Sequence, residues 1–320
     1  MRLDMIVRFY VDVSGHELDQ RAVTAAGYLC SDAQYAAFSR KWSAVLDLAG
    51  ADAFHATDFF ACQEKFKHLV KGSPRHNELG RLFARTVFDQ LPHGCVYSAD
   101  CNRFDDVLGP VFAKLKTPHD RMPAAMFAVT TICNRAAQRW LSETGLNAAR
   151  AVAFIEGGTG VGEIIDWLLH LKRIGEPWTQ AYREFVPIPK SEYGVQAADF
   201  LAYEMWCEAE ALLRDPGRKW KDVTREAFKI LATGPLMPTP EDATLVKIDT
   251  AISNDEQMRR TAPLFVSFIA ANPQYRRPPW WHGWRRRLRL AAKALWRNAG
   301  APLRGYYWRA RNRLKRSKKC

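Results

Sequence analysis

Near the start of the chain stands the stretch Phe9-Tyr10-Val11-Asp12-Val13-Ser14-Gly15. It predicts the end of a strand over residues 5–13, because Ile, Val, Phe and Tyr dominate this region and Ser14-Gly15 interrupts it. A second strand is expected over residues 23–30, and the two strands form a hairpin. The first strand therefore carries a carboxylate, Asp12, near its end.

Helical and strand patterns alternate after the hairpin. A helix is expected over residues 32–48, because apolar residues recur there at helical spacing and Ser31 is a suitable N-cap. Further helices are expected at 77–90, 123–143, 162–174, 195–213 and 223–231, and further strands at 94–101, 151–156 and 180–188. This order of elements predicts an α/β or mixed α+β layered domain.

A second acidic motif lies in the helix expected over residues 195–213. It reads Val195-Gln196-Ala197-Ala198-Asp199-Phe200-Leu201-Ala202-Tyr203-Glu204. Asp199 falls near the start of this helix, one position from an apolar stripe. A fold that brings Asp199 close to Asp12 offers carboxylate oxygens from both motifs to one metal ion.

The two motifs, in this order, resemble those of the family called domain of unknown function 3800. The resemblance covers roughly the first 210 residues, with weaker support from His55 to Asp58 and from Lys190-Ser191. It implies a ribonuclease H-like fold, a central sheet with flanking helices. One position departs from the family pattern, because members usually carry Glu after the first Asp and this chain has Val13.

The resemblance also implies a catalytic metal site. A ribonuclease H-like site would use carboxylates from the first strand, a later strand end and the last helix to hold Mg²⁺ or Mn²⁺ for phosphodiester cleavage. Asp12, Glu156 and Asp199 are the expected catalytic ligands, and Glu156 is chosen because it ends a short buried strand beside two glycines. Asp100, at the end of an earlier strand, is the reserve candidate for the third ligand.

Four other residues are candidates for the same site. His55 is the candidate general base or phosphate contact, and Ser14, Lys190 and Gln196 are candidate substrate contacts. The competing interpretation is that these are ordinary solvated side chains of surface loops.

The three acids have structural alternatives as well. Asp12 before Ser-Gly can be a turn-forming residue whose oxygen accepts hydrogen bonds from backbone N–H groups. Asp199 can be an exposed acid favoured by the dipole near a helix N-terminus, and Glu156 can cap the helix that follows it.

Charge is distributed unevenly along the chain. The net charge is +13, but residues 257–320 hold 18 of the 47 Lys and Arg residues and no Asp or Glu. The first 256 residues, with 29 basic and 34 acidic residues, therefore carry −5. A mildly acidic body with a cationic appendage suggests that chemistry and polyanion binding belong to different segments.

The basic tail has a helical pattern of its own. Trp and Leu recur at helical spacing between basic residues that include Arg285, Arg286 and Arg287, which predicts two short amphipathic helices. Such helices track nucleic-acid phosphates with aromatic rings stacked on bases, or lie on an anionic membrane surface. The third interpretation is an apolar face docked on the body; the sequence indicates no particular protein partner.

These patterns divide the chain into a ribonuclease H-like domain at 1–216, a helical accessory segment at 217–256 and the basic tail at 257–320. We expect a cytoplasmic protein, because charged residues occupy the place of a signal peptide's apolar segment. Seven cysteines without a C-x-x-C pair indicate neither a disulfide framework nor a zinc site.

The sequence thus predicts a metal-dependent phosphodiesterase, and more specifically a nuclease that acts on DNA or RNA. In this interpretation the tail binds the polyanion. The competing class is a non-catalytic protein on the same fold that binds nucleic acid or a membrane surface through its tail.

Overall fold

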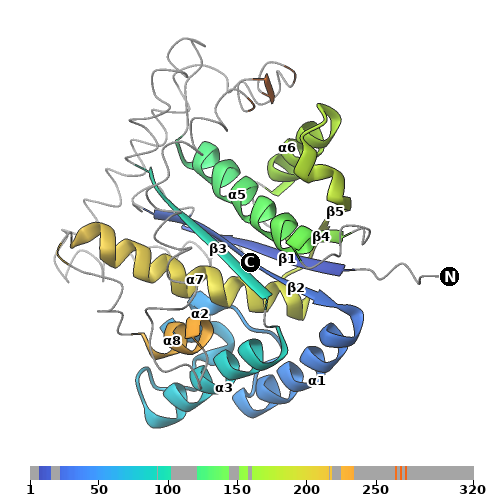
Figure 1. Ribbon diagram of the computed structural model, residues 1–320. Helices are drawn as coiled ribbons and strands as arrows, with labels where there is room; N and C mark the ends of the chain where they lie inside the picture. Colours follow the sequence, from blue (N-terminus) through green and yellow to red (C-terminus); the bar gives the residue numbers. More distant parts are fainter. Residues whose placement is uncertain are drawn as a thin grey trace, which may run out of the picture. The chain divides into compact units, whose positions relative to one another are not determined.

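A computed structural model describes residues 7–15, 22–91, 93–101, 121–143, 151–157, 161–215, 217, 225–233, 264, 267, 268 and 271. Five strands form one mixed sheet in the order β3-β2-β1-β4-β5 (Figure 1). They are β1 (Val7–Ser14), β2 (Ala22–Ser31), β3 (His93–Asp100), β4 (Ala151–Glu156) and β5 (Tyr182–Ile188). The first three strands pair antiparallel, whereas β4 runs parallel to both β1 and β5.

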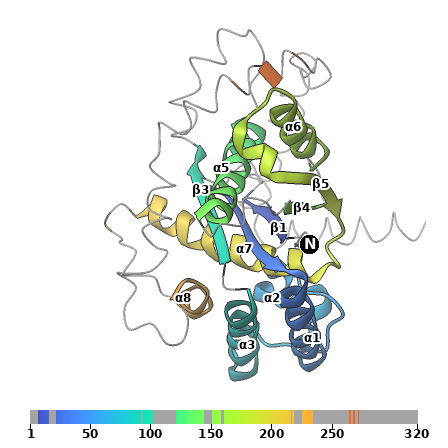
Figure 2. The same ribbon diagram turned by 45° about the vertical axis from the view of Figure 1, so that its right-hand side comes forward.

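Helices flank both faces of this sheet. They are α1 (Asp32–Ala49), α2 (Ala56–Ala61), α3 (Pro74–Gln90), α5 (Arg121–Glu143), α6 (Val161–Arg173), α7 (Tyr193–Arg214) and α8 (Glu226–Thr233). Short 3₁₀ helices span Glu64–Phe66 and Pro177–Ala181. Figures 1 and 2 show α7 across one face, with α1, α2, α3 and α8 on the same side, and α5 and α6 on the other. This mixed α/β arrangement confirms the predicted class and is compatible with a ribonuclease H-like fold.

The predicted hairpin is confirmed, because β1 pairs antiparallel with β2 from Val7↔Ser31 to Ser14↔Thr24. Ser31 caps α1 as expected: its side chain accepts the backbone N–H of Gln34, and its own N–H donates to the Gln34 side chain. The other predicted helices and strands are present with ends shifted by a few residues. None of the described helices is long and apolar enough to span a membrane.

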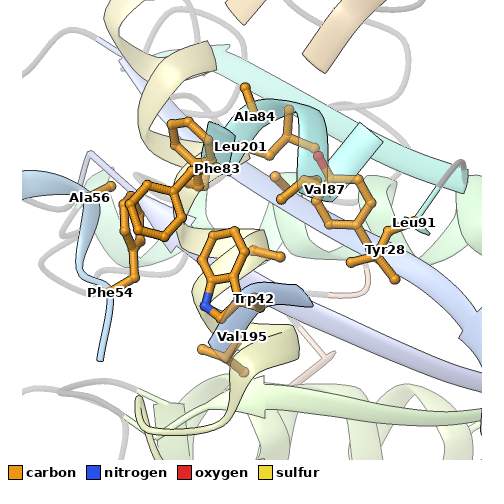
Figure 3. Close-up of a cluster of buried hydrophobic side chains, with 14 of the residues drawn as sticks. Tyr28, Trp42, Phe54, Ala56, Phe83, Ala84, Val87, Leu91, Val195 and Leu201 are labelled. Atoms are coloured by element: carbon orange, nitrogen blue, oxygen red, sulfur yellow. The ribbon is translucent and has the colours of Figure 1, made fainter. Parts of the chain in front are cut away.

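The main core lies on the α7 side of the sheet. Trp42, Phe54 and Phe83 pack ring against ring, with centroids 5.4 Å apart for Trp42 and Phe54 and 4.7 Å apart for Phe54 and Phe83. Figure 3 shows Trp42 beside Val195 of α7, with Phe54, Phe83 and Tyr28 of β2 in the same cluster. This packing fixes α7 and the segment before α2 relative to the sheet.

Gly194 allows α7 to approach β1 closely. A Cβ atom at this position would lie 2.4 Å from Cγ of Tyr10, and the Tyr10 ring is buried and cannot easily move aside. Gly194→Ala is therefore expected to displace α7 and to lower the free energy of unfolding by about 1–3 kcal/mol, measured by urea denaturation. Gly162→Ala is the control, because its added Cβ meets nothing within 4 Å. Equal stability of the two variants would contradict this account of α7 packing.

The chain near residue 268 belongs to the compact unit that contains the sheet. Phe268 is buried, and its ring packs edge-on against Trp167 of α6 with centroids 5.4 Å apart. Apart from residues 264, 267, 268 and 271, the predicted tail at 257–320 lies outside the described residues, including Arg285, Arg286 and Arg287.

Candidate catalytic site

The sheet register places Asp12 and Glu156 side by side. β1 and β4 are parallel, with Val11 opposite Ile155, so the next residue of each strand is one of these acids. Because side chains alternate along a strand, both acids lie on the face of Tyr10 and Phe154, whose rings stack 5.1 Å apart. Asp12 is inside β1 and 4% exposed, so it is a buried strand residue and the turn interpretation is wrong.

Asp199 reaches the same face of the sheet from the second turn of α7. It is 8% exposed, which corrects the alternative of an exposed acid at a helix start. Its Oδ2 accepts the backbone N–H of Ala56, the first residue of α2, at 2.8 Å. Asp199 also interacts electrostatically with Asp12 and Glu156, so the three expected ligands share one site.

Burial, and after it the crowding of charged groups, shifts the pKa values of these acids. Burial raises the pKa of Asp12 well above its usual value, and the hydrogen bond with Glu156 and the charge of Asp199 raise it further. Burial also raises the pKa of Asp199, against the opposing influence of His55 and the Ala56 N–H. Burial alone would raise the pKa of Glu156, but the hydrogen bond from Asp12 and the ammonium of Lys190 outweigh it and lower this pKa. The pKa values of the two carboxyl groups therefore shift in opposite directions, so Asp12 holds a proton more readily than Glu156 does.

A chain of polar contacts continues from Glu156 to α2. Lys190 Nζ lies 2.7 Å from Glu156 Oε1 and 3.4 Å from His55 Nε2, and His55 Nδ1 lies 3.1 Å from Asp58 Oδ2. The structure thus brings Lys190 and His55 to the three acids. Asp58 was not predicted as a site residue, because the sequence did not indicate the short helix α2. The signal that could have identified it is its position three residues after His55, which places both residues in the first turn of that helix.

Gln196 has a structural role at this site. It is 1% exposed, and its Oε1 accepts hydrogen bonds from Trp42 Nε1 at 2.8 Å and from the Phe54 N–H at 3.0 Å. Its Nε2 donates to the carbonyl oxygens of Lys190 and Ser191, both at 3.1 Å. All of its strong hydrogen-bonding capacity is used within the protein, so the predicted contact with a substrate phosphate is not supported.

The remaining candidates occupy different positions. Ser14, half-buried at the end of β1, lies two residues beyond Asp12 and on the same face by alternation. Asp100 of β3 pairs with Ala22, whereas Asp12 pairs with Ala26 of the same strand. Four residues of strand correspond to roughly 13 Å, so Asp100 is set apart from Asp12 along the sheet. Of the two candidates for the third ligand, the fold brings Glu156 to the site.

The donor chemistry of the three acids fits a hard divalent cation. Carboxylate oxygens are the ligands that Mg²⁺ and Mn²⁺ prefer. Burial is the main cause of the raised pKa values of Asp12 and Asp199, and a cation would compensate the charge of these buried groups and the repulsion between them. Across the described residues, no group of three or more His, Cys, Asp and Glu side chains is placed so that it could hold a metal ion. Because the Lys190 ammonium pairs with Glu156, a cation bound by Glu156 would compete with this ion pair.

No protein-family model matches this chain, and no curated protein matches its sequence. The support for a function therefore comes from the chemistry of the site and from the two sequence motifs.

Proposed function

We propose that this protein is a metal-dependent phosphodiesterase with a ribonuclease H-like fold, and specifically a nuclease acting on DNA or RNA. The supporting observation is the convergence of Asp12, Glu156 and Asp199 from β1, β4 and α7 on one face of the sheet. Burying three acids together is costly unless a cation compensates them, so their convergence favours a functional role. The motif resemblance to the domain of unknown function 3800 family supports the same proposal.

Each residue has a defined part in this proposal. Asp12, Glu156 and Asp199 would hold one or two Mg²⁺ or Mn²⁺ ions, which when bound supply charge stabilisation to the phosphodiester under attack. The Lys190 side chain is 55% exposed and can move from Glu156 to a phosphate oxygen. His55 faces the same space and can accept a proton from the attacking water.

The test is cleavage of labelled single- and double-stranded DNA and RNA in the presence of Mn²⁺, Mg²⁺ or EDTA. We expect cutting of at least one substrate with either metal, none with EDTA, and none by Asp199→Asn. Cutting that persists in EDTA, or the absence of cutting on every substrate, would contradict the proposed function.

We propose that the tail binds the polyanion. This prediction comes from the charge of the sequence, because Arg285, Arg286 and Arg287 lie outside the described residues. Replacing Arg285, Arg286 and Arg287 together by alanine is expected to weaken nucleic-acid binding and to reduce the slope of log K against log salt by up to about 3. Fluorescence anisotropy at several salt concentrations measures both quantities.

The control for this variant removes the same charge from the exposed body residues Arg40, Lys41 and Lys71. It is expected to leave the salt slope close to that of the wild type. If the tail variant instead keeps its nucleic-acid affinity and loses binding to vesicles of anionic lipid, the tail is a membrane-binding segment.

A second candidate function is supported by the ion pair of Lys190 with Glu156. This ammonium already compensates part of the negative charge, as expected of a site that has no metal-dependent chemistry. The protein would then be a non-catalytic nucleic-acid- or membrane-binding protein on the same fold. Salt-sensitive binding that survives Asp12→Asn, with no cleavage, would favour this candidate. Location in the cytoplasm stays a prediction in either case.

A further inference from the structure

We propose that Asp58 is a positioning residue that fixes the His55 imidazole as the proton acceptor of the site. The inference rests on the proposed phosphodiesterase function and adds to it a residue of the His55–Asp58 segment that was not among the predicted site residues. The observation behind it is the continuous series of contacts Asp58–His55–Lys190–Glu156, with adjacent atoms 3.1, 3.4 and 2.7 Å apart.

The two neighbours of the imidazole select the same tautomer. An ionised carboxylate can only accept a hydrogen bond, so Asp58 requires a proton on Nδ1 of His55. An ammonium group can only donate, so Lys190 requires a lone pair on Nε2. The neutral Nδ1–H tautomer satisfies both partners, and it presents the basic nitrogen on the side of Lys190 and Glu156.

The backbone on both sides of His55 is also held in place. The N–H of Phe54 donates to the buried Gln196 side chain, and the N–H of Ala56 donates to Asp199. Residue 55 is thus anchored to α7 through both of its neighbours. This arrangement gives the preorganisation that efficient proton transfer requires, because neither the ring nor the chain must reorganise when substrate arrives.

The proposed step balances in protons and bonds. As a phosphate draws Lys190 away, Nε2 of His55 takes a proton from a water molecule whose oxygen forms a bond to phosphorus. The bond from phosphorus to the leaving oxygen breaks, and that oxygen takes a proton from solvent. The imidazolium, stabilised by the Asp58 carboxylate, then returns its proton to solvent, so one water is consumed for each ester bond cleaved.

The decisive variant is Asp58→Asn, which keeps the size of the side chain and lets an amide N–H donate to Nδ1. This change favours the opposite tautomer, with the proton on Nε2. In the full-length protein with Mn²⁺, we expect kcat to fall by about 10²–10⁴-fold with KM little changed. Asp58→Glu is expected to restore part of the lost rate, because it keeps an accepting carboxylate.

Nitrogen-15 NMR of the imidazoles reads the tautomer without requiring any activity. We expect His55, assigned by comparison with His55→Gln, to be protonated on Nδ1 in the wild type and on Nε2 in Asp58→Asn. Asp52→Asn is the matched control, because Asp52 is an exposed acid that pairs with Lys65. It should change neither the spectrum of His55 nor kcat.

The outcomes separate this inference from the proposed function. Metal-dependent cleavage by the wild type, with Asp58→Asn equally fast, would overturn the positioning role alone. A wild-type His55 protonated on Nε2 would overturn it as well, whatever the rate. If the wild type cleaves no substrate, the proposed function fails and the catalytic role of this pair fails with it.

Discussion

Asp12→Asn is expected to reduce cleavage strongly and, at the same time, to stabilise the folded protein at neutral pH. The loss of activity follows because Asp12 is the central carboxylate of the three, hydrogen-bonded to Glu156 and electrostatically coupled to Asp199. Removing its charge is expected to lower metal-dependent cleavage by about 10³-fold or more. The measurement is the initial rate of cleavage with saturating Mn²⁺.

The gain in stability follows from the direction of the Asp12 pKa shift. The folded-state pKa is raised above the unfolded value of about 3.9, so between these two values the folded protein holds a proton that the unfolded chain releases. Stability therefore falls as pH rises through this window, and it stays lower at higher pH. Asparagine cannot ionise, so the variant should avoid this loss.

We expect Asp12→Asn to melt a few degrees above the wild type at pH 7 without metal, and the difference to disappear toward pH 4. Thermal denaturation across this pH range measures the effect. Asp89→Asn, at an exposed position of α3, is the control and should not reproduce it. A variant that is less stable than the wild type at neutral pH would show that Asp12 is a structural residue.

Gln196→Leu is expected to cause the largest loss of stability of any single change at the site. Leucine has a similar volume, but it leaves the Trp42 and Phe54 N–H groups and the carbonyl oxygens of Lys190 and Ser191 without their partner. The expected decrease in the free energy of unfolding is about 3–5 kcal/mol, measured by urea denaturation.

The matched control is Gln138→Leu, because Gln138 of α5 is half-buried and donates a hydrogen bond to Ser142. We expect it to cost about 1 kcal/mol or less. A loss below 1 kcal/mol for Gln196→Leu would mean that water replaces these partners and that Gln196 does not hold the loop carrying Lys190.

The sequence was sufficient to predict the elements that carry the three acids. Strand composition and the Ser-Gly interruption located β1, a short apolar run located β4, and helical periodicity located α7. The composition of a strand and the residues that end it are local properties of the sequence, so the positions of Asp12 and Glu156 near strand ends could be predicted. Their lateral alignment could not, because it depends on the register of two strands that are far apart in the chain.

The contacts that support the acids were not predictable for a related reason. The Gln196 side chain joins residues 154 and 142 positions away in the sequence, and no local pattern reports such hydrogen bonds. The helix α2 is six residues long, too short for a periodic signal. On α7, Glu204 is fully buried and paired with Arg225, whereas an amphipathic pattern predicts an exposed acid at such a position.

The most direct test of the central claim is a titration of Mn²⁺ into the full-length protein at neutral pH, followed by electron paramagnetic resonance. We predict saturable Mn²⁺ binding by the wild type, and we expect this binding to be lost in Asp12→Asn and in Glu156→Gln. Asp100→Asn should retain it, because Asp100 is set apart from Asp12 by four residues along the neighbouring strand β2. Absence of saturable binding by the wild type, or binding that survives Asp12→Asn, would contradict a metal site formed by Asp12, Glu156 and Asp199.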